Sequence, residues 1–169
     1  MWYVIQVGPR REHEILALCE KWVRIPSEEF FIMRCMGFKR RSDGVWDKLE
    51  RLAFPGYIFV RTDDIDDLRL RLKKIPELTK VLGAGDEIFP IYEEEEKLLW
   101  DLGGEDHFIK ASHGYRDGDK VVVVDGSLVD KEGLITWVNA HKRMALIEIQ
   151  FAGRTVRTKV GLEIITKPQ

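Results

Sequence analysis

Side chains capable of acid-base, nucleophilic or metal chemistry occur in this sequence, but they are not grouped as catalysis requires. No GxSxG, Walker A or HExxH spacing is present, and the Gly83-Ala84-Gly85 loop lacks the Lys-Ser/Thr pair of a phosphate-binding loop. Neither Cys19 nor Cys35 has the spacing of a zinc site or a disulfide framework. The histidines are equally scattered, at His13, His107, His113 and His141. The sequence therefore predicts a protein that is not an enzyme and needs no metal or cofactor.

Basic side chains, by contrast, form clusters that could bind phosphate groups. Arg10 and Arg11 begin a predicted helix, and Lys39-Arg40-Arg41 precedes the turn signal Ser42-Asp43-Gly44. Further cations follow residue 130, at Lys131, His141, Lys142, Arg143, Arg154, Arg157 and Lys159. Arg and Lys contact nucleic-acid phosphates without reading the base sequence. Each cluster is therefore either a phosphate-binding surface or ordinary solubilising charge.

The net charge conceals a difference between the two ends of the chain. Over 169 residues, 27 Lys and Arg face 29 Asp and Glu, a net charge of -2, which excludes a uniformly basic coat protein. From residue 113 to the end, nine basic residues face seven acidic ones. A local phosphate-binding surface on the C-terminal part is therefore compatible with an acidic whole.

The composition indicates a globular protein, with 44% hydrophobic and 33% charged residues. No apolar run approaches the roughly 20 residues that a membrane-spanning helix needs. The first residues lack the basic and apolar regions of a signal peptide. We therefore expect a cytoplasmic protein that makes no membrane contact.

The first part of the chain mixes helix and strand patterns. Apolar spacing and Gly or Pro breakers predict strands at residues 2–7, 30–39, 45–53, 57–61 and 79–82. Apolar residues at three- and four-residue intervals predict helices at residues 10–24, 64–75 and 92–102. This order is typical of helices packed on an antiparallel sheet of the split βαβ type.

A change of pattern near residue 110 predicts a second domain. The polar stretch from residue 103 to residue 118 has no period and favours a linker. Short predicted strands follow at residues 120–125, 133–138, 144–151, 155–160 and 163–166. So many short strands in about 50 residues favour a small curled β-barrel. The predicted class is α+β, with domains at residues 1–105 and 117–169 and a linker at residues 106–116.

Two separate motifs resemble one known family. Trp2-Tyr3-Val4-Ile5-Gln6-Val7 and Phe54-Pro55-Gly56-Tyr57-Ile58-Phe59-Val60 resemble the N-terminal (NGN) domain of the NusG family of transcription elongation factors. Gly118-Asp119-Lys120-Val121-Val122-Val123, with Phe151-Ala152-Gly153-Arg154-Thr155, is similar to an SH3-like KOW domain. Together these motifs span nearly the whole chain, and the divergent loops look like those of a specialised paralogue of the LoaP or RfaH kind.

The resemblance implies a monomeric factor that binds RNA polymerase and promotes processive antitermination. Family members bind a two-helix coiled coil on the clamp of the large polymerase subunit, and no bond-making group is required. The residues here that match this contact are Gln6, Phe54, Pro55, Tyr57 and Phe59. The sequence leaves a second interpretation open, in which these aromatic rings belong to the core. We expect Phe54, beside the turn, to face the partner.

The resemblance also assigns the basic clusters and a second partner. Arg10, Arg11, Lys39, Arg40 and Arg41 become candidate contacts with upstream or non-template DNA, and the C-terminal cations become candidates for binding a nascent leader RNA hairpin. Phe151 is a candidate contact with a small-subunit ribosomal protein or the termination factor Rho, and the sequence leaves open that its ring belongs to the core instead. An alternative interpretation is a ribosome-associated KOW-type RNA-binding protein, which leaves the first domain without a role.

Overall fold

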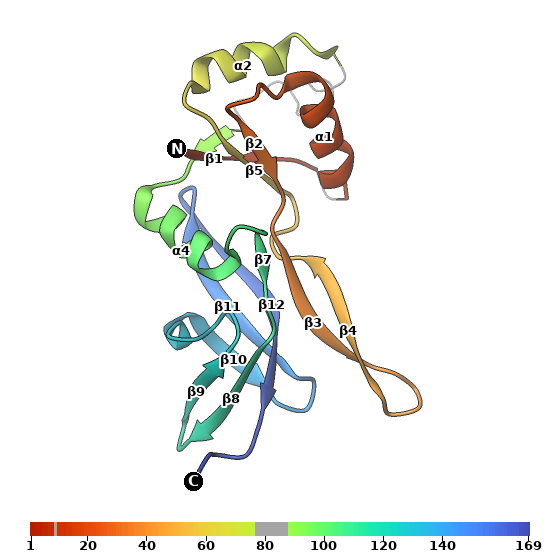
Figure 1. The fold of residues 1–169 in the computed structure, drawn as a ribbon, viewed down its shortest axis with the longest axis vertical. Helices are drawn as coiled ribbons and strands as arrows, with labels where there is room; N and C mark the ends of the chain where they lie inside the picture. Colours follow the sequence, from red (N-terminus) through yellow and green to blue (C-terminus); the bar gives the residue numbers. More distant parts are fainter. Residues whose placement is uncertain (9, 77–87) are drawn as a thin grey trace. The chain divides into compact units, whose positions relative to one another are not determined.

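The computed structural model describes residues 1–8, 10–76 and 88–169. They form two compact units, one of residues 1–32 and 54–96 and the other of residues 33–53 and 97–169, and Figure 1 shows their helices and strands. The mixed α+β class predicted from the sequence is confirmed. Among the described residues, no helix is long and apolar enough to cross a membrane.

The first unit is built on a four-stranded antiparallel sheet in the order β2-β5-β1-β6. Its strands are β1 (Trp2–Gln6), β2 (Glu29–Phe31), β5 (Tyr57–Arg61) and β6 (Ile88–Pro90). Side chains alternate between the two faces of a sheet, and the register puts Trp2, Phe31 and Phe59 on one face. Their ring centroids are 5.0–6.5 Å apart, so this face has an aromatic core.

Helices complete the first unit where the sequence periodicity predicts them. α1 (Glu12–Leu18) continues as the π-helix η1 (Cys19–Val23), α2 is Ile65–Lys73, and α4 is Glu93–Gly103. Ile15 on α1 and Leu68 and Leu72 on α2 are buried, as the three- and four-residue spacing requires. The last turns of α4 belong to the second unit.

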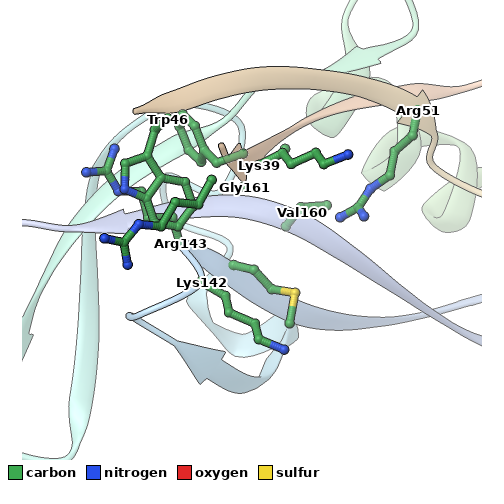
Figure 2. Close-up of a pocket in the computed structure, with 11 residues that line it drawn as sticks. Lys39, Trp46, Arg51, Lys142, Arg143, Val160 and Gly161 are labelled. Atoms are coloured by element: carbon green, nitrogen blue, oxygen red, sulfur yellow. The ribbon is translucent and has the colours of Figure 1, made fainter. Parts of the chain in front are cut away.

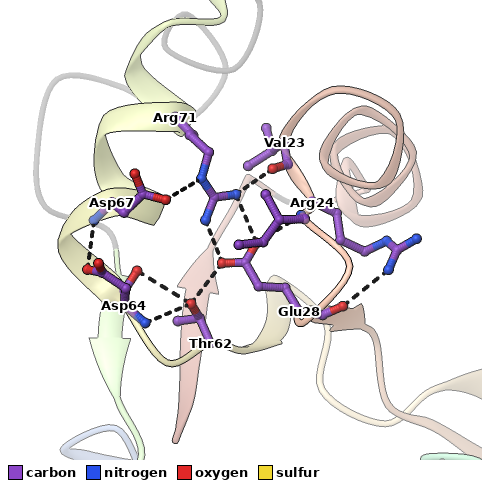
Figure 3. A network of polar contacts seen from close by, with 8 residues as sticks. Val23, Arg24, Glu28, Thr62, Asp64, Asp67 and Arg71 are labelled. Atoms are coloured by element: carbon purple, nitrogen blue, oxygen red, sulfur yellow. Dashed lines mark hydrogen bonds and ion pairs between the residues drawn. The ribbon is translucent and has the colours of Figure 1, made fainter.

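A buried ion pair fastens α2 within the first unit (Figure 3). The carboxylate of Glu28, whose side chain is 1% exposed, accepts two hydrogen bonds from Arg71, at 2.8 and 2.5 Å. Thr62 donates a third hydrogen bond to it from Oγ1, at 2.8 Å, and Arg71 also pairs with Asp67 at 2.8 Å. Asp64 caps the start of α2 by accepting a hydrogen bond from the Asp67 N–H at 3.0 Å. Every charge at the centre of this network therefore has a partner.

The second unit contains two sheets. β3 (Arg34–Arg40) and β4 (Trp46–Leu52) form an antiparallel hairpin, and β7 (Phe108–Ile109) pairs with β3 in parallel. A five-stranded sheet has the order β10-β11-β12-β8-β9. Its strands are β8 (Ser112–Asp117), β9 (Lys120–Asp125), β10 (Ile135–Asn139), β11 (Met144–Phe151) and β12 (Arg154–Ile164), with the short 3-10 helix η2 (Glu132–Leu134) between β9 and β10. Ile147, Ile149 and Leu162 fill its interior, which agrees with a small SH3-like KOW fold.

Two predicted strand boundaries are wrong. Residues 30–39 form two strands, β2 and β3, which belong to separate sheets. The chain passes from one sheet to the other at Ile32 and Met33. Both residues are buried, as strand residues often are, so the sequence showed no break there. Residues 155–166 hold a single strand, β12, that continues through Gly161. Within the predicted linker, residues 106–116, lie β7 and most of β8, and the domain bounds stay a prediction. The strand predicted at residues 79–82 lies outside the described residues.

Candidate functional site

A rigid turn at residues 54–57 displays the motif that the sequence singles out in the first unit. The Tyr57 N–H donates to the Phe54 carbonyl at 3.3 Å, and Gly56 has a φ of +87°, which is the left-handed conformation that glycine adopts most easily after a proline in a turn. The Gly56 carbonyl accepts a hydrogen bond from the Val7 N–H at 2.8 Å. The backbone of the turn is therefore anchored to the end of β1.

Glu12, a residue that the sequence did not single out, holds the other side of this turn. Its Oε1 accepts a hydrogen bond from the Gly56 N–H at 2.8 Å, and the residue is only 2% exposed. An acidic residue in the first turn of a helix is common because it interacts favourably with the helix dipole. The sequence position of Glu12 therefore gave no sign that it holds the turn. Both polar groups of Gly56 are satisfied, and the turn has one backbone geometry.

The structure divides the five predicted polymerase-binding residues into two groups. Phe54 is 2% exposed and packs against fully buried Phe59, with ring centroids 6.2 Å apart. Pro55 is exposed, while Tyr57 and Gln6 are half-buried and face each other as register partners on β5 and β1. The expectation that the Phe54 ring faces a partner is therefore corrected, because that ring and that of Phe59 belong to the core. Pro55, Tyr57 and Gln6 form the outer surface, here called the turn surface.

The predicted DNA-contacting cations differ in how they are held. Arg10 is exposed, with a φ of +66°, and Arg11 pairs with Glu14 at 3.0 Å. At the hairpin, Arg41 is held by Asp43 at 2.7 Å and by Asp47 at 3.7 Å. The hydrogen bonds from Arg41 and from the Val45 N–H keep the pKa of Asp43 below its usual value. Arg41 is thus part of the hairpin turn, whereas Lys39 and Arg40 are exposed on β3.

The predicted RNA-contacting cations are similarly divided. Lys131 lies 3.6 Å from Asp101, and Arg157 pairs with Glu148 at 2.9 Å. His141, Lys142 and Lys159 are exposed, and Arg154 and Arg143 are half-buried. Phe151, the candidate partner contact, is 0% exposed. Its ring is a core element of the KOW sheet, so its expected role at the surface is corrected.

Part of the hairpin cluster and part of the barrel cluster line one cleft within the second unit (Figure 2). Its volume is about 240 Å³, and five of its lining residues are cations: Lys39, Arg40, Arg51, Lys142 and Arg143. This site is called the basic cleft below. The sequence named four of these residues but placed them in two separate clusters, and it did not indicate Arg51.

The two cysteines, Cys19 and Cys35, are free thiols buried in the core, where they pack as apolar side chains. Burial raises the pKa of the Cys19 thiol to about 12, with a smaller contribution from Glu20. Burial also raises the pKa of Cys35, partly opposed by Arg51. Thiols with raised pKa values are poor nucleophiles. The candidate sites are therefore the turn surface and the basic cleft.

Comparison with known proteins assigns the chain to a family. The family model described as "Transcription termination factor nusG" matches residues 1–99, more than half of the chain. The chain therefore belongs to the NusG family. The transcription termination/antitermination protein NusG of Thermus thermophilus is 24% identical over 98% of this chain and 97% of its own length. The NusG protein of Pseudomonas aeruginosa is 27% identical over 96% of this chain and 94% of its own length.

A solved structure supports the same fold. The structure described as "Domain interaction in Thermotoga maritima NusG" covers 96% of this chain and 92% of that chain, with a TM-score of 0.54 and 20% sequence identity. At this identity the likeness concerns the fold alone. The prediction of the NusG family from two short motifs is confirmed, and the protein is a member of a family of transcription termination and antitermination factors.

Proposed function

We propose that this protein is an elongation factor that binds the clamp of RNA polymerase through the turn surface and promotes processive antitermination in the cytoplasm. The observation that carries the proposal is the pairing of exposed Pro55 and half-buried Tyr57 with a backbone fixed by Glu12 and Val7. A preformed turn loses little conformational entropy on binding. An aromatic residue on such a turn is suited to anchor a helical partner.

The mechanism is stabilisation of a closed polymerase clamp, which disfavours pausing and termination without any chemical step. Residues 1–105 would carry this contact, and residues 117–169, joined to them by residues 106–116, would recruit a leader RNA or a protein partner such as a small-subunit ribosomal protein. Specialised paralogues of the LoaP or RfaH kind act on selected operons, and the exposed KOW cations support such a role here. No observation favours the ribosome-associated alternative.

A polymerase pull-down with Tyr57→Ala tests the proposal. Truncating an aromatic anchor typically costs about 2 kcal/mol of binding free energy, which corresponds to roughly a 30-fold weaker complex. Tyr92→Ala is the matched control, because Tyr92 is 60% exposed elsewhere on the first unit. Phe54→Ala is unsuitable, because removal of its buried ring destabilises the fold itself by about 3–5 kcal/mol. Full polymerase binding by folded Tyr57→Ala would refute the clamp contact.

A second variant tests whether the shape of the turn matters. Glu12→Ala keeps Pro55 and Tyr57 but leaves the Gly56 N–H without its acceptor. We expect weaker polymerase binding than wild type, with Glu14→Ala as the control, since Glu14 makes only an exposed pair with Arg11. If Glu12→Ala binds normally, the turn surface does not depend on this anchor.

A further inference from the structure

The basic cleft is formed by close packing of the β3–β4 hairpin on β12. Arg51 Nη2 donates a hydrogen bond to the Lys159 carbonyl at 2.9 Å, and Cys35 Sγ lies 3.7 Å from the same oxygen. Gly161 makes this approach feasible, because a Cβ there would lie 2.8 Å from the Met36 carbonyl oxygen. The two walls of the cleft therefore depend on a glycine in the middle of a strand, where it would otherwise only weaken the strand.

The charge in the cleft has one sign. Eleven described residues line it, namely Gly37, Phe38, Lys39, Arg40, Trp46, Arg51, Lys142, Arg143, Met144, Val160 and Gly161, and none of them is acidic. Within the described residues, Lys39, Arg40 and Lys142 make no ion pair. In Figure 2, Arg143 lies at one end of the cleft and Arg51 at the other, with Lys39 between them. Like charges that line one cleft repel one another, and an anion bound among them reduces that repulsion.

Arg143 is oriented by aromatic contacts rather than by a strong ion pair. Its guanidinium carbon lies 4.5 Å from the centre of the Trp46 ring and 5.9 Å from that of Phe38. Its acidic neighbour Glu163 is 3.6 Å away and is shared with His113. A guanidinium stacked on a ring keeps donors at its edge for bidentate contact with phosphate.

The backbone at Arg143 is also unusual for its residue type. Its φ is +52°, in the left-handed region that costs a non-glycine residue energy. The preceding turn is held by a hydrogen bond from the Lys142 N–H to Asn139 Oδ1 at 3.0 Å. Leu162 fixes its far end, because its N–H donates to the Arg143 carbonyl at 3.0 Å. The turn therefore presents Lys142 and Arg143 in one fixed conformation.

We propose that the hairpin and the barrel turn form one composite site for the phosphodiester backbone of a single nucleic-acid strand. Cations line the cleft from both walls, so a polyanion can meet several of them, whereas a lone phosphate can meet only a few. About 240 Å³ is smaller than the typical small-molecule pocket of roughly 300–1,000 Å³, and a duplex would rest on its rim. The stacked Arg143 and Trp46 also offer a base a planar surface.

Charge removal on both walls is the first test. We expect the double variant Lys39→Gln, Lys142→Gln to bind a labelled single-stranded oligomer of about ten nucleotides more weakly than wild type. This length is within the usual range of single-strand binding sites. Each lost phosphate contact removes about 0.7 from the slope of log affinity against log salt. The double variant should therefore show a slope shallower by about 1.4 and roughly 20-fold weaker binding at 0.1 M salt.

A matched control distinguishes the loss of cations in the cleft from the loss of net positive charge. The control is the double variant Arg41→Gln, Arg157→Gln, which changes the net charge by the same amount. One of its substitutions lies on the hairpin and the other on the barrel. Both arginines are held by acidic neighbours, at 2.7 and 2.9 Å, and neither lines the cleft. We expect affinity within about twofold of wild type, because separated surface charges are screened at 0.1 M salt. Equal losses in the two double variants would overturn the proposal.

Gly161→Ala tests whether the two walls act together. It keeps all five cations, but its Cβ would press on the Met36 carbonyl at 2.8 Å and on the Phe38 ring at 3.2 Å, which separates the hairpin from β12. We expect affinity for the oligomer to fall at least tenfold, with circular dichroism confirming that the barrel is folded. Wild-type affinity in a folded Gly161→Ala protein would show independent clusters and overturn the composite site; if this variant does not fold, the charge variants decide.

The choice of probe distinguishes the two sources of such a strand. Oligo(U) RNA and oligo(dT) DNA of equal length share the backbone chemistry and differ in the 2′-hydroxyl. Cleft-dependent binding of both, or of either one alone, supports the proposal and identifies the source, and binding of neither overturns it. This assay contains no polymerase, so its result is independent of the Tyr57→Ala pull-down that tests the clamp contact.

Discussion

Two charged clusters in this protein place arginine in opposite surroundings. In the first unit, Glu28 and Arg71 are joined by two hydrogen bonds, with side chains 1% and 18% exposed. In the second unit, five cations line a cleft that contains no acidic residue among its described lining. In the first cluster the protein itself supplies the counter-charges, whereas in the second the described lining supplies none, and among the described residues only Arg143 has an acidic neighbour, Glu163, at 3.6 Å. The partners of a charge, rather than its residue type, distinguish structure from binding.

The same distinction holds between neighbours on one hairpin. Lys39, Arg40 and Arg41 are all exposed. Arg41 is held by Asp43 and Asp47, while Lys39 and Arg40, the two residues before it, make no ion pair within the described residues. Exposed pairs such as that of Arg41 contribute only about 0–1 kcal/mol. They nevertheless remove a cation from the set available to phosphate, which reduces a run of three basic residues to two.

Breaking the buried pair should have the largest effect of any charge change. Glu28→Gln leaves Arg71 without its main counter-charge, and removal of one partner of a buried pair typically costs about 3–5 kcal/mol. We expect the free energy of unfolding, measured with urea, to fall by about 3 kcal/mol. Glu29→Gln is the control, because it makes the same substitution one position along the chain in a side chain that is 42% exposed. A loss no larger than that of Glu29→Gln would contradict a structural role for the network.

The same pair should also produce a pH dependence of stability. Burial raises the pKa of Glu28, but hydrogen bonds from Arg71, Thr62 and the Ile25 N–H outweigh it, so the folded-state pKa lies below the usual 4.5. A carboxyl with a lowered pKa stabilises the fold above its unfolded pKa, and this stability is lost as the pH falls through the folded value.

Urea unfolding measured between about pH 3 and pH 6 checks this sign. Wild type should lose stability below about pH 4.5, and Glu28→Gln should lose less over the same interval, because its amide does not titrate. Parallel curves for the two proteins would show that other carboxyl groups govern the acid transition.

Much of the fold follows from local sequence signals. The spacing of Ile65, Leu68 and Leu72 predicted α2, and the Phe54-Pro55-Gly56-Tyr57 turn predicted the start of β5. Signals that depend on distant partners were missed. Gly161 looked like a break between strands, but it is a strand residue that admits the hairpin. Only the folded chain shows that a glycine is needed for close approach rather than for a turn.

For the candidate sites, too, local signals were visible in the sequence and contacts between distant residues were not. Residue types identified the turn motif and the basic clusters, because Pro-Gly and Lys-Arg runs are visible along the sequence. Which rings were buried was not visible, since Phe54 and Tyr57 differ by three positions but lie in the core and at the surface respectively. Glu12 and Arg51 were missed because their partners, Gly56 and Lys159, are 44 and 108 residues away.

The smallest expected effect is on the free energy of unfolding of the double variant Lys39→Gln, Lys142→Gln. Lys39 and Lys142 are exposed and lie among other cations without an acidic partner in the cleft. Replacing both with Gln therefore removes repulsion and no attraction, so the free energy of unfolding should rise slightly or stay within about 0.5 kcal/mol of wild type. The same urea measurement used for Glu28→Gln applies. A loss of more than about 1 kcal/mol would mean that these lysines support the fold, and the contrast between partnered and unpartnered charge would then fail at the cleft.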